Sequence, residues 1–192
     1  MMKVLIIYHP DFASKGKFER KISRILSDVK DYIIIYGQDH QGLIKSKFPE
    51  NRLVQVDFEY ASTDATHAIV IDSESRPIYA DLVEKTLLNI PVRYIKDKIT
   101  FVSNKDKGEH FDVYCGRGTL WGNPYAIGSD GDRDEVIRKF KYDFDRDYLK
   151  GGITFKEKLI AHRGKTLGCH CKPYPCHGDV LAKFLNELDD GE

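Results

Sequence analysis

Three cysteines and two histidines are concentrated in the segment GCHCKPYPCHGD, residues 168–179. Thiolates and imidazoles act as metal ligands, nucleophiles and proton carriers. Side chains alternate in an extended segment, so we expect Cys169 and Cys171 to point the same way and His170 the opposite way. Cys176 and His177 stand at the start of a predicted helix, where the helix dipole would lower the pKa of a thiol. This segment is the first candidate for chemistry in the chain.

Three interpretations of the segment remain open from its residues alone. In the first, Cys169, Cys171, Cys176 and His177 bind zinc, although Cys-x-Cys chelates less well than the usual Cys-x2-Cys. In the second, Cys176 is a reactive thiolate in a substrate pocket, with His177 as general base and Asp179 as its partner or as a helix cap. In the third, the cysteines are small buried apolar residues in a rigid turn. We favour the pocket, because the spacing fits a folded turn better than tetrahedral chelation.

A glycine-rich segment, GRGTLWGNPYAIGSDGD at residues 116–132, is the second candidate. Its glycines allow the backbone to approach a ligand closely. Arg117 could bind a phosphate or carboxylate with two parallel hydrogen bonds, and Trp121 offers a face on which a base can stack. Asn123 adds a donor and an acceptor. The alternative is that Trp121 packs in a core and the glycines form ordinary turns.

Taken together, the patterns YxGRxxxWGNPY, GxDGDRDEVIRKF and GKTLGCHCKPYPCHGDVLAKF resemble the DUF4326 family of small bacterial and phage proteins, over residues 111–188. The resemblance implies a fold unit and a candidate site, but no assigned reaction. Cys115 and His170 depart from the residues usual in the family. The positions that match its motif are Arg117, Trp121, Asn123, Pro124, Arg133, Glu135, Cys169, Cys171, Pro173, Cys176, His177 and Asp179.

The N-terminal half resembles the SLOG Rossmannoid domains, which bind nucleotides and nucleotide-derived signals. VLIIYHPDF and HAIVIDSESRPIYADLVEKTLLNIPVRYI carry this resemblance. It implies that Ser73, Ser75 and Arg76 contact a ligand at the carboxyl end of their strand, where open α/β sheets bind ligands. Residues 37–42, GQDHQG, replace the Gly-Gly phosphate turn of that family. Because side chains crowd the backbone donors there, this departure weakens the expectation of a phosphate site.

Alternating apolar runs and helical patterns predict an α/β fold of two domains. Residues 1–97 are expected to form a Rossmann-like parallel sheet with flanking helices, and residues 98–192 a smaller α+β domain that contains the Cys/His segment. The first domain should have strands at 4–8, 32–36, 52–56, 68–72 and 91–95 and helices at 17–29 and 78–88. The second should have strands at 99–103, 111–114 and 166–168 and helices at 133–149, 155–162 and 179–188.

The charge balance argues against a nucleic-acid-binding protein. Lys plus Arg and Asp plus Glu number 30 each, so the net charge is zero and no basic stripe is evident. The first apolar run is too short to span a membrane, and clustered rather than spread cysteines indicate reduced thiols, so we expect a cytoplasmic protein. Nothing in the sequence predicts an oligomeric state.

Two functions are consistent with these residues. The first is a hydrolase or group transferase acting on a nucleotide or nucleoside derivative, in which Arg117, Asn123, Cys169, Cys176, His177 and Asp179 converge on one pocket. The alternative is a non-catalytic module that binds or sequesters a nucleotide, with a structural Cys/His site that holds zinc. In either case the expected ligand is a small nucleotide-type molecule.

Overall fold

A computed structural model describes residues 1–57, 64–87, 89–189 and 191. The chain divides into two compact units. Unit 1 comprises Met1–Asp97 together with Glu187–Glu192, and unit 2 comprises Lys98–Asn186. Within the described residues, no helix is both long and apolar enough to cross a membrane.

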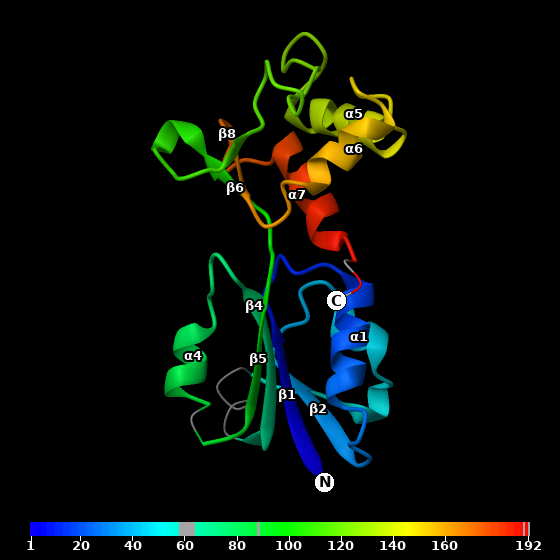
Figure 1. Cartoon of the computed structure of the whole chain (residues 1–192), viewed down its shortest axis with the longest axis vertical. Helices are drawn as coiled ribbons and strands as arrows, with labels where there is room; N and C mark the ends of the chain where they lie inside the picture. Colours follow the sequence, from blue (N-terminus) through cyan, green and yellow to red (C-terminus); the bar gives the residue numbers. More distant parts are fainter. Residues whose placement is uncertain (58–63, 88, 190, 192) are drawn as a thin grey trace. The chain divides into compact units, whose positions relative to one another are not determined.

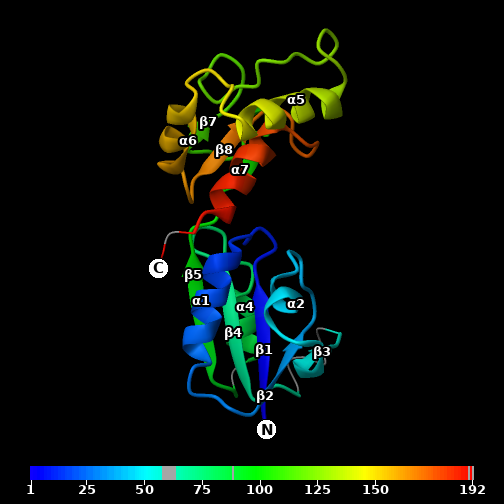
Figure 2. The same cartoon turned by 90° about the vertical axis from the view of Figure 1, so that its right-hand side faces the viewer.

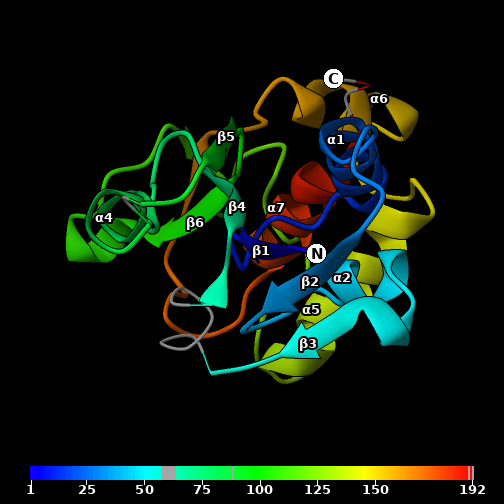
Figure 3. The ribbon, with the colours of Figure 1, turned by 90° about the horizontal axis from the view of Figure 1, so that it is seen from below.

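Unit 1 is built on a five-stranded parallel sheet with the order β3-β2-β1-β4-β5. Figure 3 shows these strands succeeding one another across the sheet. The predicted Rossmann-like sheet is therefore confirmed. The central strands β1 and β4 are almost wholly buried, as expected for apolar runs covered on both faces. The strands are β1 (Met2–Tyr8), β2 (Tyr32–Tyr36), β3 (Leu53–Gln55), β4 (His67–Ser73) and β5 (Val92–Asp97).

Helices cover both faces of this sheet. Helices α1 (Lys15–Ile25) and α2 (Leu43–Lys47) lie on one face and α4 (Ala80–Lys85) on the other (Figure 1). A 3-10 turn, η1 (Glu50–Arg52), precedes β3. The strand order changes direction between β1 and β4, which is the position where open α/β sheets bind ligands.

The predicted helix at residues 78–88 is shorter than expected. The buried carboxylate of Asp72 accepts the backbone N–H groups of Ile78 at 3.0 Å and Tyr79 at 2.8 Å. Asp72 therefore holds the amides of Ile78 and Tyr79 in a turn, and α4 begins only after it, at Ala80. Its last turn ends before Leu88, which lies outside the described residues.

Unit 2 contains a three-stranded parallel sheet, β6-β8-β7, formed by β6 (Phe101–Asn104), β7 (Val113–Tyr114) and β8 (Thr166–Cys169). Its helices are α5 (Arg133–Asp145), α6 (Ile153–Ile160) and α7 (His177–Glu187), and a 3-10 turn, η2, spans Lys105–Lys107. Helix α5 ends before the predicted residue 149, because Asp147 adopts a left-handed conformation at φ 59°.

Aromatic side chains hold the three helices of unit 2 together. Figure 2 shows the ribbons of these helices, α5, α6 and α7. Phe144 of α5 packs edge to face against Phe155 of α6 at 5.9 Å and against Phe184 of α7 at 5.2 Å between ring centroids. Phe140, one turn earlier, packs against His177 at 5.1 Å. This core fixes the start of α7 beside α5, and with it the last residues of the Cys/His segment.

Candidate functional site

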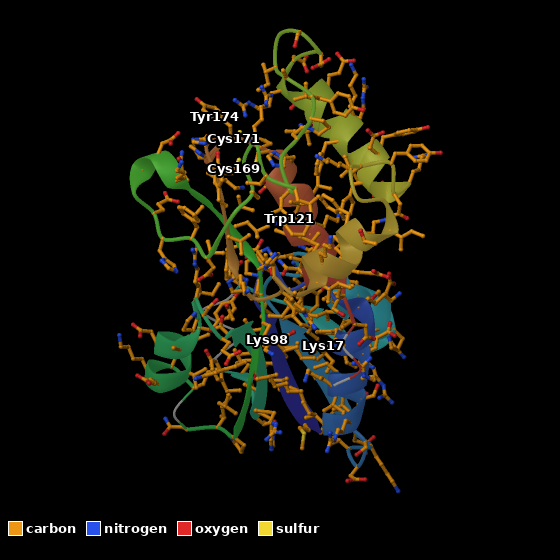
Figure 4. The ribbon with its side chains drawn as sticks, turned by 45° about the horizontal axis from the view of Figure 1, so that its top comes forward. Lys17, Lys98, Trp121, Cys169, Cys171 and Tyr174 are labelled. Carbon is orange, nitrogen blue, oxygen red and sulfur yellow. The ribbon has the colours of Figure 1, made fainter. Side chains whose placement is uncertain are left out.

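The Cys/His segment connects the end of β8 to the start of α7. Cys169 closes the strand and Cys176 immediately precedes the helix; both are buried, and Cys171 between them is half-buried. The sulfur atoms of Cys169, Cys171 and Cys176 all lie within 4.8 Å of one another. Figure 4 shows Cys169 and Cys171 together near Tyr174. We call these three residues the thiol cluster; all are free thiols.

Hydrogen bonds within the thiol cluster favour a thiolate at Cys169. The neighbouring thiols of Cys115 and Cys176 and the backbone N–H of Cys171 hold the pKa of Cys169 far below its usual range. The thiol of Cys115 also lies 3.2 Å from the carbonyl oxygen of Gly168, to which it donates. The pKa of Cys176 is raised, because its thiol donates to Cys169 and is buried. Burial also raises the pKa of Cys171, against the opposing effect of Arg133.

This arrangement corrects the direction expected for Cys176. Cys176 does precede helix α7, whose dipole favours an anion. The hydrogen bond to Cys169, burial and the proximity of Cys169 raise the pKa of Cys176 and outweigh the helix dipole.

The thiol cluster lines a cavity of about 210 Å³, here called the thiol cavity. Five of the six residues expected to converge on one pocket line it, and Asp179 does not. Tyr125 and His170, which the sequence did not single out as ligand contacts, also line it, although Tyr125 closes the WGNPY pattern. The residues with functional groups facing this cavity are Arg117, Asn123, Tyr125, Arg133, Cys169, His170, Cys171, Cys176 and His177.

Two arginines of the thiol cavity have no carboxylate partner in the part of the chain that the structure describes. Arg117 donates from Nη2 to the carbonyl oxygen of Tyr125 at 3.2 Å. Arg133, the first residue of α5, donates from Nη1 to the carbonyl oxygen of Pro175 at 3.3 Å and lies over the Tyr174 ring. A guanidinium carries five N–H donors. Both side chains therefore retain N–H donors for an anion, and Arg133 also acts on the thiol of Cys171.

Asn123 and Trp121 have structural partners. The amide of Asn123 donates to the carbonyl oxygen of Val136 at 3.1 Å and accepts from the N–H of Tyr125 at 3.0 Å, which fixes the loop. Trp121 packs edge to face against Phe155 and His162. It does not line the thiol cavity, and Figure 4 shows it apart from Cys169 and Cys171. The structure thus brings Asn123 to the site but not Trp121.

His177 and Asp179 also form local contacts. The buried His177 donates from Nε2 to the carbonyl oxygen of Cys115 at 2.7 Å, so a neutral ring leaves Nδ1 unprotonated. Asp179 accepts the N–H of Cys176 at 2.9 Å, as the third residue of a helix does in a capping box, and pairs with Lys172 at 2.6 Å. Asp179 is therefore a helix cap, one of the two roles foreseen for it.

His170 is held by two partners outside the cavity lining. Its Nδ1 lies 2.7 Å from a carboxylate oxygen of Asp106, and its Nε2 lies 2.7 Å from the hydroxyl of Tyr114. These contacts orient the imidazole between two neighbouring cysteines. Its departure from the usual family residue is thus accommodated by Asp106 and Tyr114, neither of which the sequence indicated.

The metal-ligand set that the structure supports has three members. The thiol cluster is a group of metal-binding atoms, but neither ring nitrogen of His177 belongs to it. This differs from the expected set of four, because Nε2 of His177 is directed to the Cys115 carbonyl.

The candidates of unit 1 lie after β4. The hydroxyl of Ser73 accepts the N–H of Arg76 at 3.1 Å and lies 3.4 Å from the hydroxyl of Ser75, so Ser73 shapes the turn. Ser75 and Arg76 are exposed. A separate cavity of about 240 Å³ lies at the ends of β1 and β2 and is lined by Tyr8, Gln38, His40 and Tyr79. Ser73, Ser75 and Arg76 do not line it.

In the GQDHQG segment, the carboxylate of Asp39 occupies the backbone donors at the start of α2. The carboxylate of Asp39 accepts the N–H groups of Ile44 at 3.1 Å and Lys45 at 3.0 Å, and the hydroxyl of Tyr8 at 2.5 Å. These are the backbone donors that a phosphate would otherwise take. The weakened expectation of a phosphate site in this loop therefore has a direct physical cause.

Comparisons with known proteins match both halves of the chain. Residues 101–187 match the domain of unknown function DUF4326, and residues 1–103 match the minimal SLOG domain. An uncharacterized 12.4 kDa protein in the nrdA-td intergenic region of Enterobacteria phage T4 is 50% identical over 88 residues, which cover 45% of this chain and 78% of that protein. No solved structure matches the chain.

Proposed function

The chain belongs to the minimal SLOG domain and DUF4326 families, and we propose that it is an enzyme that processes a nucleotide or nucleoside derivative, as a hydrolase or group transferase. The minimal SLOG domain supports a nucleotide-related role. A zero net charge favours a small nucleotide-type ligand over a nucleic acid.

The observation that carries this proposal is the composition of the thiol cavity. Arg117 and Arg133, without carboxylate partners among the described residues, line the same cavity as the three cysteines. Convergent cationic donors bind a phosphate or carboxylate. An anion held by the two arginines would lie in the same cavity as the cysteines. The arginines would thus hold the anionic group of the substrate against the reacting centre.

We further propose that the thiol cluster holds zinc. Zn–S bonds of about 2.3 Å in a tetrahedral site place sulfur atoms about 3.8 Å apart, which fits three sulfurs within 4.8 Å. Three protein ligands leave a fourth position for water or substrate, as in catalytic rather than structural zinc sites. When bound, zinc would supply a Lewis acid and a water of lowered pKa.

The other residues of the site would position these groups. In this proposal Arg117 and Arg133 bind the anion, His177 accepts a proton at Nδ1, and Asp179 fixes Cys176 by capping α7. Cys176 would act as a ligand rather than as a free nucleophile, because its sulfur lies within 4.8 Å of those of Cys169 and Cys171.

A second candidate function is a non-catalytic module that binds or sequesters a nucleotide. The observation that favours it is that His177 and Asp179 both have structural partners, Cys115 and Cys176. The thiol cluster would then serve as a structural metal site beside an anion-binding cavity.

A turnover assay separates the two candidates. The purified chain, supplied with zinc, is incubated with nucleoside mono-, di- and triphosphates and nucleotide–sugar and dinucleotide derivatives, and products are detected by mass spectrometry. The enzyme proposal expects a product that is lost in Arg133→Ala and Cys171→Ser but retained in Lys141→Ala, a substitution on the exposed face of α5. Saturable binding without any product would favour the sequestering module.

A further inference from the structure

A second cavity adjoins the thiol cavity within unit 2. Its volume is about 540 Å³, and we call it the loop cavity because residues 117–130 and 148–150 form much of its wall. Arg117, Asn123 and Tyr125 line both cavities. The two spaces are therefore neighbours, and Arg117 lies at their boundary.

Arg117 offers N–H donors for an anion at that boundary. A single hydrogen bond, to the carbonyl oxygen of Tyr125, accounts for one of its five donors among the described residues. Its side chain is exposed and belongs to no ion pair within the described part of the chain. A phosphate at this guanidinium would be open to the thiol cavity on one side and to the loop cavity on the other.

The loop cavity contains groups that suit a ribose and a base. Carboxylates of Asp130 and Asp143 line it, and carboxylates accept hydrogen bonds from sugar hydroxyls. Asp143 also accepts the hydroxyl of Tyr125 at 2.6 Å, and this bond raises the pKa of Tyr125. Tyr148 is 69% exposed at the rim, so its ring face is free to stack on a base.

The cavity volumes indicate a ligand with two parts. Ligand pockets usually measure about 300–1,000 Å³, so the thiol cavity alone, at about 210 Å³, is too small for a whole nucleotide. The loop cavity, at about 540 Å³, is large enough for a nucleoside. We propose that the loop cavity binds the nucleoside part of a nucleoside phosphate derivative, with the phosphate on Arg117 and the reacting part in the thiol cavity. This inference rests on the proposed function and names its substrate class.

Binding measurements on the full chain test the inference. Inorganic phosphate, ribose 5-phosphate and the four common nucleoside 5′-monophosphates are the probes, titrated by calorimetry. We expect at least one monophosphate to bind about tenfold more tightly than inorganic phosphate, as base stacking allows. Tyr148→Ala should remove most of that advantage without changing phosphate affinity, and Arg117→Ala should weaken both ligands.

Two controls keep the test specific. Tyr142→Ala removes an exposed tyrosine of α5 that does not line the loop cavity, and should leave every affinity unchanged. Asp143→Asn preserves side-chain size and should weaken the monophosphate only. The nucleoside site would be overturned if phosphate and all monophosphates bound equally. It would also be overturned if Tyr148→Ala left the ratio of monophosphate to phosphate affinity unchanged. Either result would leave the proposed function intact. If Arg117→Ala changes no affinity, the anion site is wrong, and both proposals fail.

Discussion

Nε2 of His177 lies 2.7 Å from the carbonyl oxygen of Cys115, and this bond joins the two segments that the sequence marks as candidates for chemistry. Cys115 stands between β7 and the glycine-rich loop, and His177 begins α7 after the Cys/His turn. Because the imidazole is buried and packs against Phe140, the contact fixes the loop bearing Arg117 relative to the cysteines. The thiol cavity depends on this connection.

Replacing His177 tests that connection. His177→Ala leaves the Cys115 carbonyl without its donor, and we expect a loss of about 1–3 kcal/mol in the free energy of unfolding. His177→Gln can offer an amide N–H near the position of Nε2 and should recover much of the loss. Chemical denaturation measures both. If His177 also carries a proton in catalysis, His177→Gln should be stable but inactive; equal stability of wild type and His177→Ala would show that the bond does not hold the loop.

Gly122 is a glycine of the loop at which a side chain would meet backbone atoms. A Cβ there would lie 2.7 Å from the carbonyl oxygen of Gly116 and 2.9 Å from Cα of Arg117. Because both neighbours are backbone atoms, relief requires the loop to move. We expect Gly122→Ala to cost about 1–3 kcal/mol and to weaken phosphate binding at Arg117. Ser129→Ala, on an exposed part of the same loop, is the matched control. Unchanged melting temperature and phosphate affinity in Gly122→Ala would contradict this close packing.

His9 predicts a pH dependence for unit 1. Burial lowers its pKa from 6.5, outweighing the attraction of Asp11 and Asp72, and His40 lowers it further. The folded state therefore favours neutral His9, and its Nδ1 accepts the N–H of Asp11 at 3.1 Å. As the pH falls through 6.5 the unfolded chain takes up this proton first, so stability should decrease below that pH.

The variant His9→Asn isolates this effect. Asparagine keeps an acceptor for the Asp11 amide but does not titrate, so its melting temperature should fall less than that of the wild type between about pH 7 and pH 5. Melting curves across this range, followed by calorimetry, measure the difference. If the melting temperatures of the two proteins fell equally with pH, the pH dependence would belong to groups other than His9.

Local patterns predicted much of the fold, and distant partners explain the differences. The apolar runs at residues 4–8 and 32–36 are strands of a parallel sheet; the first is buried throughout and the second from Ile34 onward. The helix expected from residue 78 starts at Ala80, because Asp72 captures the amides before it. No periodicity within the helix reveals that contact.

The site shows the same division between local and distant effects. Residue types indicated Arg117 and the cysteines that line the thiol cavity, and the family resemblance added Arg133. The raised pKa of Cys176 could not be predicted, because it depends on the thiol of Cys169 at the end of β8. Trp121 looked equally suited to bind a base or to pack a core, and only its contacts with Phe155 and His162 place it in the packing.

The zinc content of the purified chain tests the central claim, that three thiols form one centre beside the two arginines. After expression in zinc-supplemented medium, elemental analysis should find about one zinc per chain in the wild type and in Cys115→Ala, whose cysteine lies outside the group. Cys169→Ser, Cys171→Ser and Cys176→Ser should each lose most of it, and a chelator should lower the melting temperature of the wild type. Less than about a tenth of an equivalent in the wild type, or undiminished zinc in Cys171→Ser, would contradict the claim.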